Sequence, residues 1–201
     1  GAPAFGTPEY MRATQMTGQL VRHYKLPMRS SGTCAANVPD GQAMWETSNS
    51  LWAAVQSRTN MVYHAAGWLE GGLIASPEKF VMDCEVLQMI QRYFEASIVA
   101  TTPDDLAFET IKQVGPGGHY FGCQHTQDRY QDAFYAPIMS DWRNYEAWNL
   151  DGAEWTAERA HRIYKQILAE FEAPAMNGDH QEELRRFVAK RKQEGGAPTD
   201  F

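Results

Sequence analysis

The residue types best suited to chemistry are gathered in one segment, Tyr63–Gly72, which has the sequence YHAAGWLEGG. His64 can serve as an acid, a base or a polar partner near neutral pH. Tyr63 and Trp68 offer aromatic faces, which attract quaternary ammonium groups through cation–π interaction, and Glu70 adds a carboxylate. A structural interpretation stands beside this functional one: His64 would be a hydrogen-bonded structural histidine, and Trp68 would belong to the core.

Two further stretches could approach a ligand. Gly71 and Gly72 let the backbone come close to a bound molecule. The loop Arg29–Asp40, RSSGTCAANVPD, contains Thr33 and Cys34 and is rich in small and polar groups, which suits a ligand loop. An ordinary turn between a strand and a helix explains the same composition and is favoured from these residues alone. Cys34 lacks a neighbouring base in the sequence, so a nucleophilic role has little support.

The cysteine and histidine positions do not form a metal-binding pattern. The three cysteines are odd in number and far apart, with no C-x-x-C pair, so reduced thiols are expected. Cys123 and His125 have a spacing outside the usual structural-zinc patterns, and no second cluster completes them. We expect no directly bound metal. A zinc site assembled from Cys34, Cys123 and His64 is the alternative that metal analysis would test.

Helix-start signals predict the elements that position these residues. Thr7-Pro8-Glu9 combines an N-cap, a proline at the first helical position and an early acid, and Ser76-Pro77-Glu78 repeats the combination. The sequence predicts helices over residues 7–24, from Asp40, from Ser76, from Asp104 to the turn at Gly115, and over residues 156–172 and 179–192. In the helix from Ser76, a helical stripe predicts the buried face, namely Phe80, Cys84, Leu87, Ile90 and Phe94.

Short extended stretches lie between the helices. Strands are predicted within Leu26–Ser31 and Asn60–Ala66, and a weaker one within His119–Cys123. Strands that alternate with long helices are typical of βαβ units and a parallel sheet, in which functional groups gather in the loops after the strands. Glycine-rich G-x-G-x-x-G phosphate loops are absent from the sequence. The residues after Leu150 are predicted to be helical and to pack over the sheet or a neighbouring subunit.

Composition excludes some classes of function. The 201 residues carry a net charge of −7, with acids and bases mixed along the chain, so a basic nucleic-acid surface is not expected. Apolar runs do not approach the ~20 residues that a membrane helix needs. A signal-peptide pattern is absent at the start of the sequence, and a cytoplasmic protein without membrane contact is expected.

Several long segments resemble one known family. GTPEY at 6–10, HAAGWLEGGL at 64–73, SPEKFVMD at 76–83 and the run from VGPGGHYFGC to NYEAW at 114–148 are similar to the C-terminal half of the trimethylamine methyltransferase family. That family includes glycine betaine methyltransferases. The resemblance implies an α/β fold: the C-terminal part of a (β/α)8 TIM barrel over residues 1–150, with a helical C-terminal extension over residues 151–201.

The resemblance also implies a reaction and its participants. A methyl group would pass from a quaternary or tertiary methylamine, such as a betaine, to the Co(I) form of a cobalamin carried by a separate corrinoid protein. The protein must then hold the cation, align the methyl group and exclude water, because the cofactor supplies the nucleophile.

Site residues follow from the same resemblance. His64 would be the active-site residue, orienting substrate or corrinoid without covalent catalysis. Tyr63, Trp68 and Glu70 would hold the cation, and His64 or Arg29 would pair with a substrate carboxylate. The residues expected near the corrinoid or the substrate are Gly71, Gly72, Thr33 and Cys34.

Two departures from the family pattern refine these expectations. Members that act on trimethylamine carry pyrrolysine, expected roughly in the Arg29–Asp40 loop, where this chain has only standard residues; this favours a betaine-like substrate. The N-terminal half of the barrel is absent from the chain, so we expect it to be inactive alone, or to need a homo-oligomer or a complementary barrel half. A non-catalytic barrel remnant acting as an assembly or binding module is the second hypothesis, and a zinc-dependent methyltransferase barrel is the third.

Overall fold

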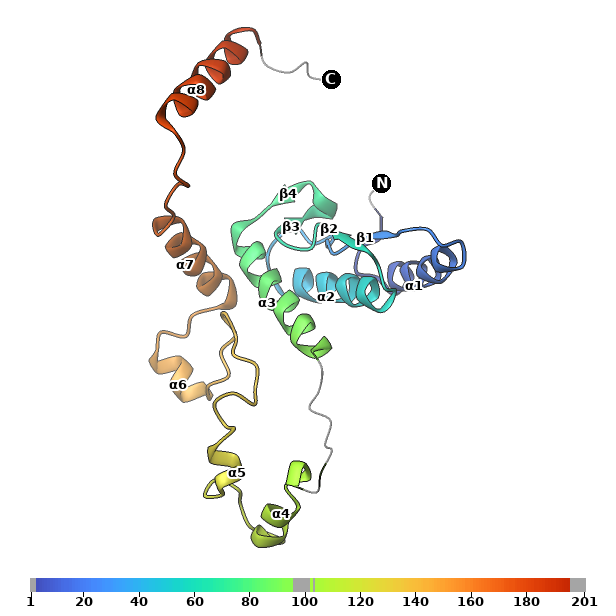
Figure 1. Ribbon diagram of the computed structural model, residues 1–201, viewed down its shortest axis with the longest axis vertical. Coiled ribbons are helices and arrows are strands. Elements are labelled where there is room, and N and C mark those ends of the chain that lie inside the picture. The colour runs from blue at the N-terminus through green and yellow to red at the C-terminus, as the bar shows by residue number, and fades with distance from the viewer. Residues whose placement is uncertain (1–2, 96–101, 103, 196–201) are drawn as a thin grey trace. The chain divides into compact units, whose positions relative to one another are not determined.

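The computed structural model describes residues 3–95, 102 and 104–195 (Figure 1). The chain divides into two compact units, Gly1–Gln166 and Ile167–Phe201, and each is considered by itself. The division into a barrel part over residues 1–150 and an extension over 151–201 stays a prediction.

Local signals at the helix starts are confirmed. Thr7, Asp40 and Ser76 each accept a backbone N–H with the side chain, at 3.3, 3.2 and 3.2 Å. The helices are α1 (Pro8–His23), α2 (Gly41–Gln56), α3 (Pro77–Phe94), α4 (Phe108–Val114), α5 (Gln124–Gln127), α6 (Tyr145–Leu150), α7 (Thr156–Ala169) and α8 (Gly178–Gln193), with 3-10 turns at Glu70–Gly72 and Asp104–Leu106.

A parallel strand pair joined through a helix lies in the first unit. β1 (Arg29–Ser31) pairs with β2 (Met61–Tyr63) in parallel, and α2 lies between them in the chain, so β1, α2 and β2 form a βαβ unit (Figure 1). The register places Arg29 opposite Met61 and Ser31 opposite Tyr63. The strands predicted within Leu26–Ser31 and Asn60–Ala66 are confirmed, each as three residues of the predicted stretch, and the chain is a helix-rich α/β structure.

A small hairpin follows the βαβ unit. β3 (Trp68–Leu69) and β4 (Ile74–Ala75) pair antiparallel around the Glu70–Gly72 turn. The sequence analysis predicted no strands at these positions. The strand predicted within His119–Cys123 is wrong. Cys123 bonds locally instead: its N–H donates to Tyr120 O at 3.0 Å, and its carbonyl accepts from the N–H groups of Thr126 and Gln127 in α5. Backbone groups that form hydrogen bonds with nearby residues are not available to pair with another strand.

The buried face of α3 differs from the predicted stripe. Ile90 is buried, but Phe80 and Phe94 are 54% and 55% exposed. Three charged side chains of the helix are buried as well, and they are Lys79, Asp83 and Glu85. Apolar spacing alone predicted the wrong face because burial of these charges depends on partners both within the helix, where Lys79 pairs with Asp83, and far away in the sequence, at Thr47, Gly67 and residues 138–140.

Glu85 connects α3 to a distant segment. Its carboxylate accepts three consecutive backbone N–H groups, from Ile138 at 3.3 Å, Met139 at 2.7 Å and Ser140 at 3.0 Å. Arg159 of α7 donates to Met139 O at 2.8 Å from the other side. Val81, Met82, Met139 and Ala160 complete the contact as one buried apolar cluster.

The second unit contains α8, which confirms the helix predicted over residues 179–192. All residues of α8 are exposed, including its apolar side chains Leu184, Phe187 and Val188. The predicted packing of this helix over a sheet or a neighbouring subunit stays a prediction. Across the part of the chain that is described, no helix has the length and apolar character needed to cross a membrane.

Candidate functional site

His64 lies directly after β2 and is held in an unusual backbone conformation. Its φ is +50°, in the left-handed region that non-glycine residues seldom adopt. Nδ1 lies 3.2 Å from Ser31 Oγ, so the strand that runs parallel to β2 holds the imidazole. The Trp68 ring meets the imidazole edge-on, with centroids 5.3 Å apart. Strain that surrounding contacts maintain is concentrated at functional positions in proteins, which favours the functional interpretation of His64.

Arg29 and Tyr63 form a second contact pair at this end of the unit. The Arg29 guanidinium lies over the Tyr63 ring, with Cζ 4.7 Å from the ring centroid. The Tyr63 and His64 rings lie 6.1 Å apart. The side chain of Tyr63 is 45% exposed. One face of Tyr63 therefore already carries a cation, and the ring fixes the position of that cation.

Arg29 and His64 line one groove with a volume of about 450 Å³. Tyr10 of α1 lines it as well, and its hydroxyl donates to Ser31 O at 3.3 Å. The groove thus combines a fixed cation, an imidazole and a phenol. Such groups can bind a small molecule that carries a carboxylate.

The loop that contains Glu70 lies beside the same histidine. Glu70 is exposed, with a φ of +49°. Its N–H donates to Ala36 O at 2.9 Å, and Gly71 N–H donates to Cys34 O at 2.8 Å. A Cβ added at Gly72, whose φ is +97°, would lie 3.6 Å from His64 Nε2. Glycine therefore leaves that edge of the imidazole open.

Thr33 and Cys34 are placed inside the protein. Their side chains are 1% and 0% exposed. Burial raises the pKa of the Cys34 thiol, against the smaller opposing effect of nearby Lys79, which favours the unreactive protonated form. The thiol donates to Trp68 O at 3.4 Å. Both side chains can thus influence the site through the loop they support, and direct contact with a ligand stays a prediction.

The described residues do not form a metal centre. Within residues 3–95, 102 and 104–195, no three His, Cys, Asp or Glu side chains gather closely enough to hold a metal ion. The alternative zinc site built from Cys34, Cys123 and His64 is therefore without a ligand cluster among these residues.

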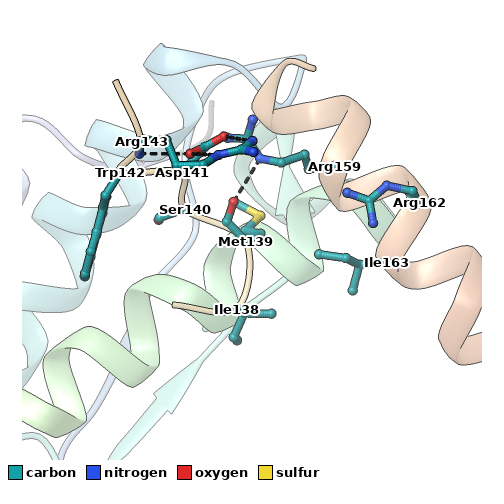
Figure 2. Close-up of a pocket in the computed structure, with 9 residues that line it drawn as sticks. All are labelled: Ile138, Met139, Ser140, Asp141, Trp142, Arg143, Arg159, Arg162 and Ile163. Atoms are coloured by element: carbon teal, nitrogen blue, oxygen red, sulfur yellow. Dashed lines mark hydrogen bonds and ion pairs between the residues drawn. The ribbon is translucent and has the colours of Figure 1, made fainter. Parts of the chain in front are cut away.

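A second cavity, of about 600 Å³, lies between the 138–143 segment and α7 (Figure 2). Three arginines line it, and each already has a partner. Arg143 pairs with Asp141 at 2.6 Å, and Arg162 pairs with Glu154 at 2.9 Å. The Arg159 guanidinium donates to Met139 O. Arg143 lowers the pKa of Asp141 to about 2, so this carboxylate stays charged and paired. The cavity is a structural junction rather than a free anion site.

Comparison with known proteins decides the family. The family model described as trimethylamine methyltransferase matches residues 1–196. The chain belongs to the trimethylamine methyltransferase family. Within that family, it is 36% identical over 197 residues to a glycine betaine methyltransferase of Desulfitobacterium hafniense, covering 98% of this chain and 40% of that protein.

More distant members have other substrates in their names. A trimethylamine methyltransferase of Methanosarcina mazei is 27% identical over 191 residues, which cover 94% of this chain and 38% of the relative. An L-carnitine:corrinoid methyltransferase of Eubacterium limosum is 26% identical over 170 residues, covering 84% and 35%. The chain spans about two fifths of the length of the curated relatives it matches.

Two residues that line the candidate groove, Tyr10 and Ser31, were not singled out from the sequence. Tyr10 stands in the GTPEY motif, but nothing in the motif indicates that α1 reaches the end of β1. Ser31 is the last residue of β1, and only the register with β2 places it beside His64. Strand pairing supplies this information, and a single sequence does not.

Proposed function

We propose that this chain forms part of a corrinoid-dependent methyltransferase that demethylates a betaine-like quaternary amine. The observation that carries the proposal is the convergence of Arg29 and His64 on one groove, in a member of this family. The higher identity to a glycine betaine methyltransferase than to the trimethylamine enzymes supports a substrate that carries a carboxylate. The absence of pyrrolysine from the sequence supports the same choice.

The contacts divide the work of substrate binding. Arg29, fixed on Tyr63, would pair with the carboxylate, and His64 would donate to it or orient it. The ammonium group would bind away from Arg29, because like charges repel on the same face of a ring. Trp68, the opposite face of Tyr63 and the exposed carboxylate of Glu70 would therefore surround the cation.

The Gly71–Gly72 edge fits the approach of a large planar cofactor carried by a partner protein. A Cβ at Gly72 would fill the space beside His64 Nε2, and glycine leaves this space free. When bound, a reduced corrinoid would supply the nucleophile that accepts the methyl group, and the nitrogen of the leaving tertiary amine would be neutral. The chain itself would orient the methyl group and exclude water.

The same proposal places the β1–α2–β2 unit in a (β/α)8 barrel, in which the ends of β1 and β2 face the catalytic side. The parallel pairing and the position of His64 after the strand support this placement. Closure of the barrel by a complementary half or a second copy of the chain is part of the proposal.

The proposal is tested with the complete gene product that contains this chain. The protein is mixed with chemically reduced cob(I)alamin and, separately, with glycine betaine, L-carnitine, choline and trimethylamine, and the absorbance of methylcobalamin is followed. We expect methyl transfer from a betaine and none from trimethylamine. Absence of transfer from every donor, with a folded protein, would contradict the proposal and favour a non-catalytic assembly module.

A further inference from the structure

A buried ion pair lies behind the turn that follows His64. Lys79 and Asp83, one turn apart on α3, have side chains 0% and 2% exposed and form an ion pair. Lys79 Nζ also donates to Thr47 Oγ1 of α2 at 2.8 Å. Desolvation raises the pKa of Asp83, and the charge and hydrogen bond of Lys79 oppose that rise. Because two buried charges are costly to desolvate, the pair is poorly explained as a source of stability alone.

The other oxygen of Asp83 holds the turn. Asp83 Oδ2 accepts the N–H of Gly67 at 2.9 Å, and the carbonyl of Gly67 accepts from Ser76 N, the cap of α3, at 2.9 Å. Gly67 has a φ of +83°, and a Cβ there would lie 3.1 Å from Phe80 Cβ. Both the N–H and the carbonyl of Gly67 are therefore hydrogen-bonded, and its backbone packs closely against α3.

The turn joins the two rings of the candidate site. His64 stands three residues before Gly67, and Trp68 stands directly after it. The near end is fixed by Ser31 at His64 Nδ1, and the Trp68 carbonyl is fixed by the Cys34 thiol. The Asp83 contact fixes the middle of this span, between the two rings that face each other at 5.3 Å.

We propose that the Lys79–Asp83 pair positions the turn from His64 to Trp68, so that both rings keep the orientation needed for substrate. Lys79 holds the Asp83 carboxylate, and Asp83 holds Gly67. Both are positioning residues that do not touch substrate. The link to turnover rests on the proposed function, whereas the link to order in the turn does not.

The first variant removes both charges together, Lys79→Met with Asp83→Leu, because apolar replacement of a whole buried pair is often tolerated. Asp83→Ala is the second variant, in case the double variant does not fold. Hydrogen exchange of the peptide covering residues 64–69 reports the order of the turn without any substrate. Steady-state methyl transfer reports kcat and KM separately.

Glu85→Gln is the matched control. Glu85 is buried on the same helix and also accepts backbone N–H groups, but it holds residues 138–140 and not the turn. We expect exchange at residues 64–69 to rise at least tenfold in a folded Lys79/Asp83 variant. We expect kcat to fall roughly 10- to 100-fold, as when a group that orients a site is removed. Glu85→Gln should leave both quantities within about threefold of the wild type.

Each outcome decides the question. Faster exchange at 64–69 together with lower kcat supports the positioning role. Unchanged exchange, or faster exchange with unchanged kcat, overturns it, and so does an equal effect of Glu85→Gln. If the wild type transfers no methyl group, the proposed function fails, and positioning is then judged by exchange alone.

Discussion

The guanidinium of Arg29 lies over the Tyr63 ring, which holds it at the groove. Arg29→Ala is expected to weaken binding of glycine betaine about tenfold or more, because a hydrogen bond to a charged group contributes about 1.5–3 kcal/mol. Choline carries the same ammonium group without a carboxylate, so its binding should not weaken. Isothermal titration of both ligands measures the difference. Arg12→Ala, on the exposed side of α1, is the control and should affect neither ligand. Equal losses for both ligands would show that Arg29 does not bind the carboxylate.

Gly72 leaves one edge of His64 open, and a methyl group there should close it. Gly72→Ala would force a side chain into a φ of +97°, at a cost on the order of 1–3 kcal/mol. Gly117→Ala is matched, because its φ is +79° and a Cβ there meets no atom within 4 Å. Both variants should unfold at a lower temperature than the wild type. Methyl transfer should fall only in Gly72→Ala, and an equal fall in both would contradict a role beside His64.

Among the site residues, those in one continuous segment were the most accessible to sequence analysis. His64 and Trp68 were singled out together, and their rings are in contact. The contacts of Arg29 with Tyr63 and of Ser31 with His64 depend on the register between β1 and β2. A single sequence contains no direct record of that register, so these contacts become visible only in the fold.

At the scale of elements, features that depend on neighbouring residues were predicted, and features that depend on distant residues were not. The starts of α1, α2 and α3 were predicted because a capping side chain bonds its own helix within three residues. The buried face of α3 was not predicted, because Lys79, besides pairing with Asp83 on its own helix, donates to Thr47 on α2, 32 residues away. A lysine beside a helix start is usually exposed, so composition gave no sign of its burial.

Helix α7 is fastened to the start of α3 by His161 and Glu78, whose Nδ1 and Oε1 lie 2.8 Å apart. The hydrogen bond from His161 lowers the pKa of Glu78 below its usual 4.5. A depressed carboxyl pKa stabilises the fold above the unfolded value, and this stabilisation is lost as pH falls from about 4.5 through the folded pKa. Glu78→Gln should therefore lower stability at pH 6 and make little difference below the folded pKa.

Urea unfolding of wild type and variant from pH 6 to pH 3 measures this dependence. Glu9→Gln, in the first turn of α1, serves as the control and should leave the shape of the pH profile unchanged. A Glu78→Gln profile that runs parallel to the wild type over the whole range would show that the pair does not couple to folding.

At the scale of the whole molecule, the division into two compact units has a direct consequence. Removal of residues 170–201 keeps α7 complete and deletes α8, whose residues are all exposed. We expect the midpoint of thermal unfolding of the first unit to stay within about 2–4 °C, the shift that about 1 kcal/mol produces in a domain of this size. A larger fall, measured by circular dichroism on the same preparation, would show that the second unit supports the first.

The carboxylate of Glu85 accepts a hydrogen bond from the backbone N–H of Met139, 54 residues further along the chain. These hydrogen bonds and the α7 contacts beside them hold together the two ends of the intervening stretch. The entropic cost of closing such a loop rises only with the logarithm of its length, by about 0.6 kcal/mol for each doubling. A short insertion between these two ends should therefore cost little stability and leave the βαβ unit unchanged.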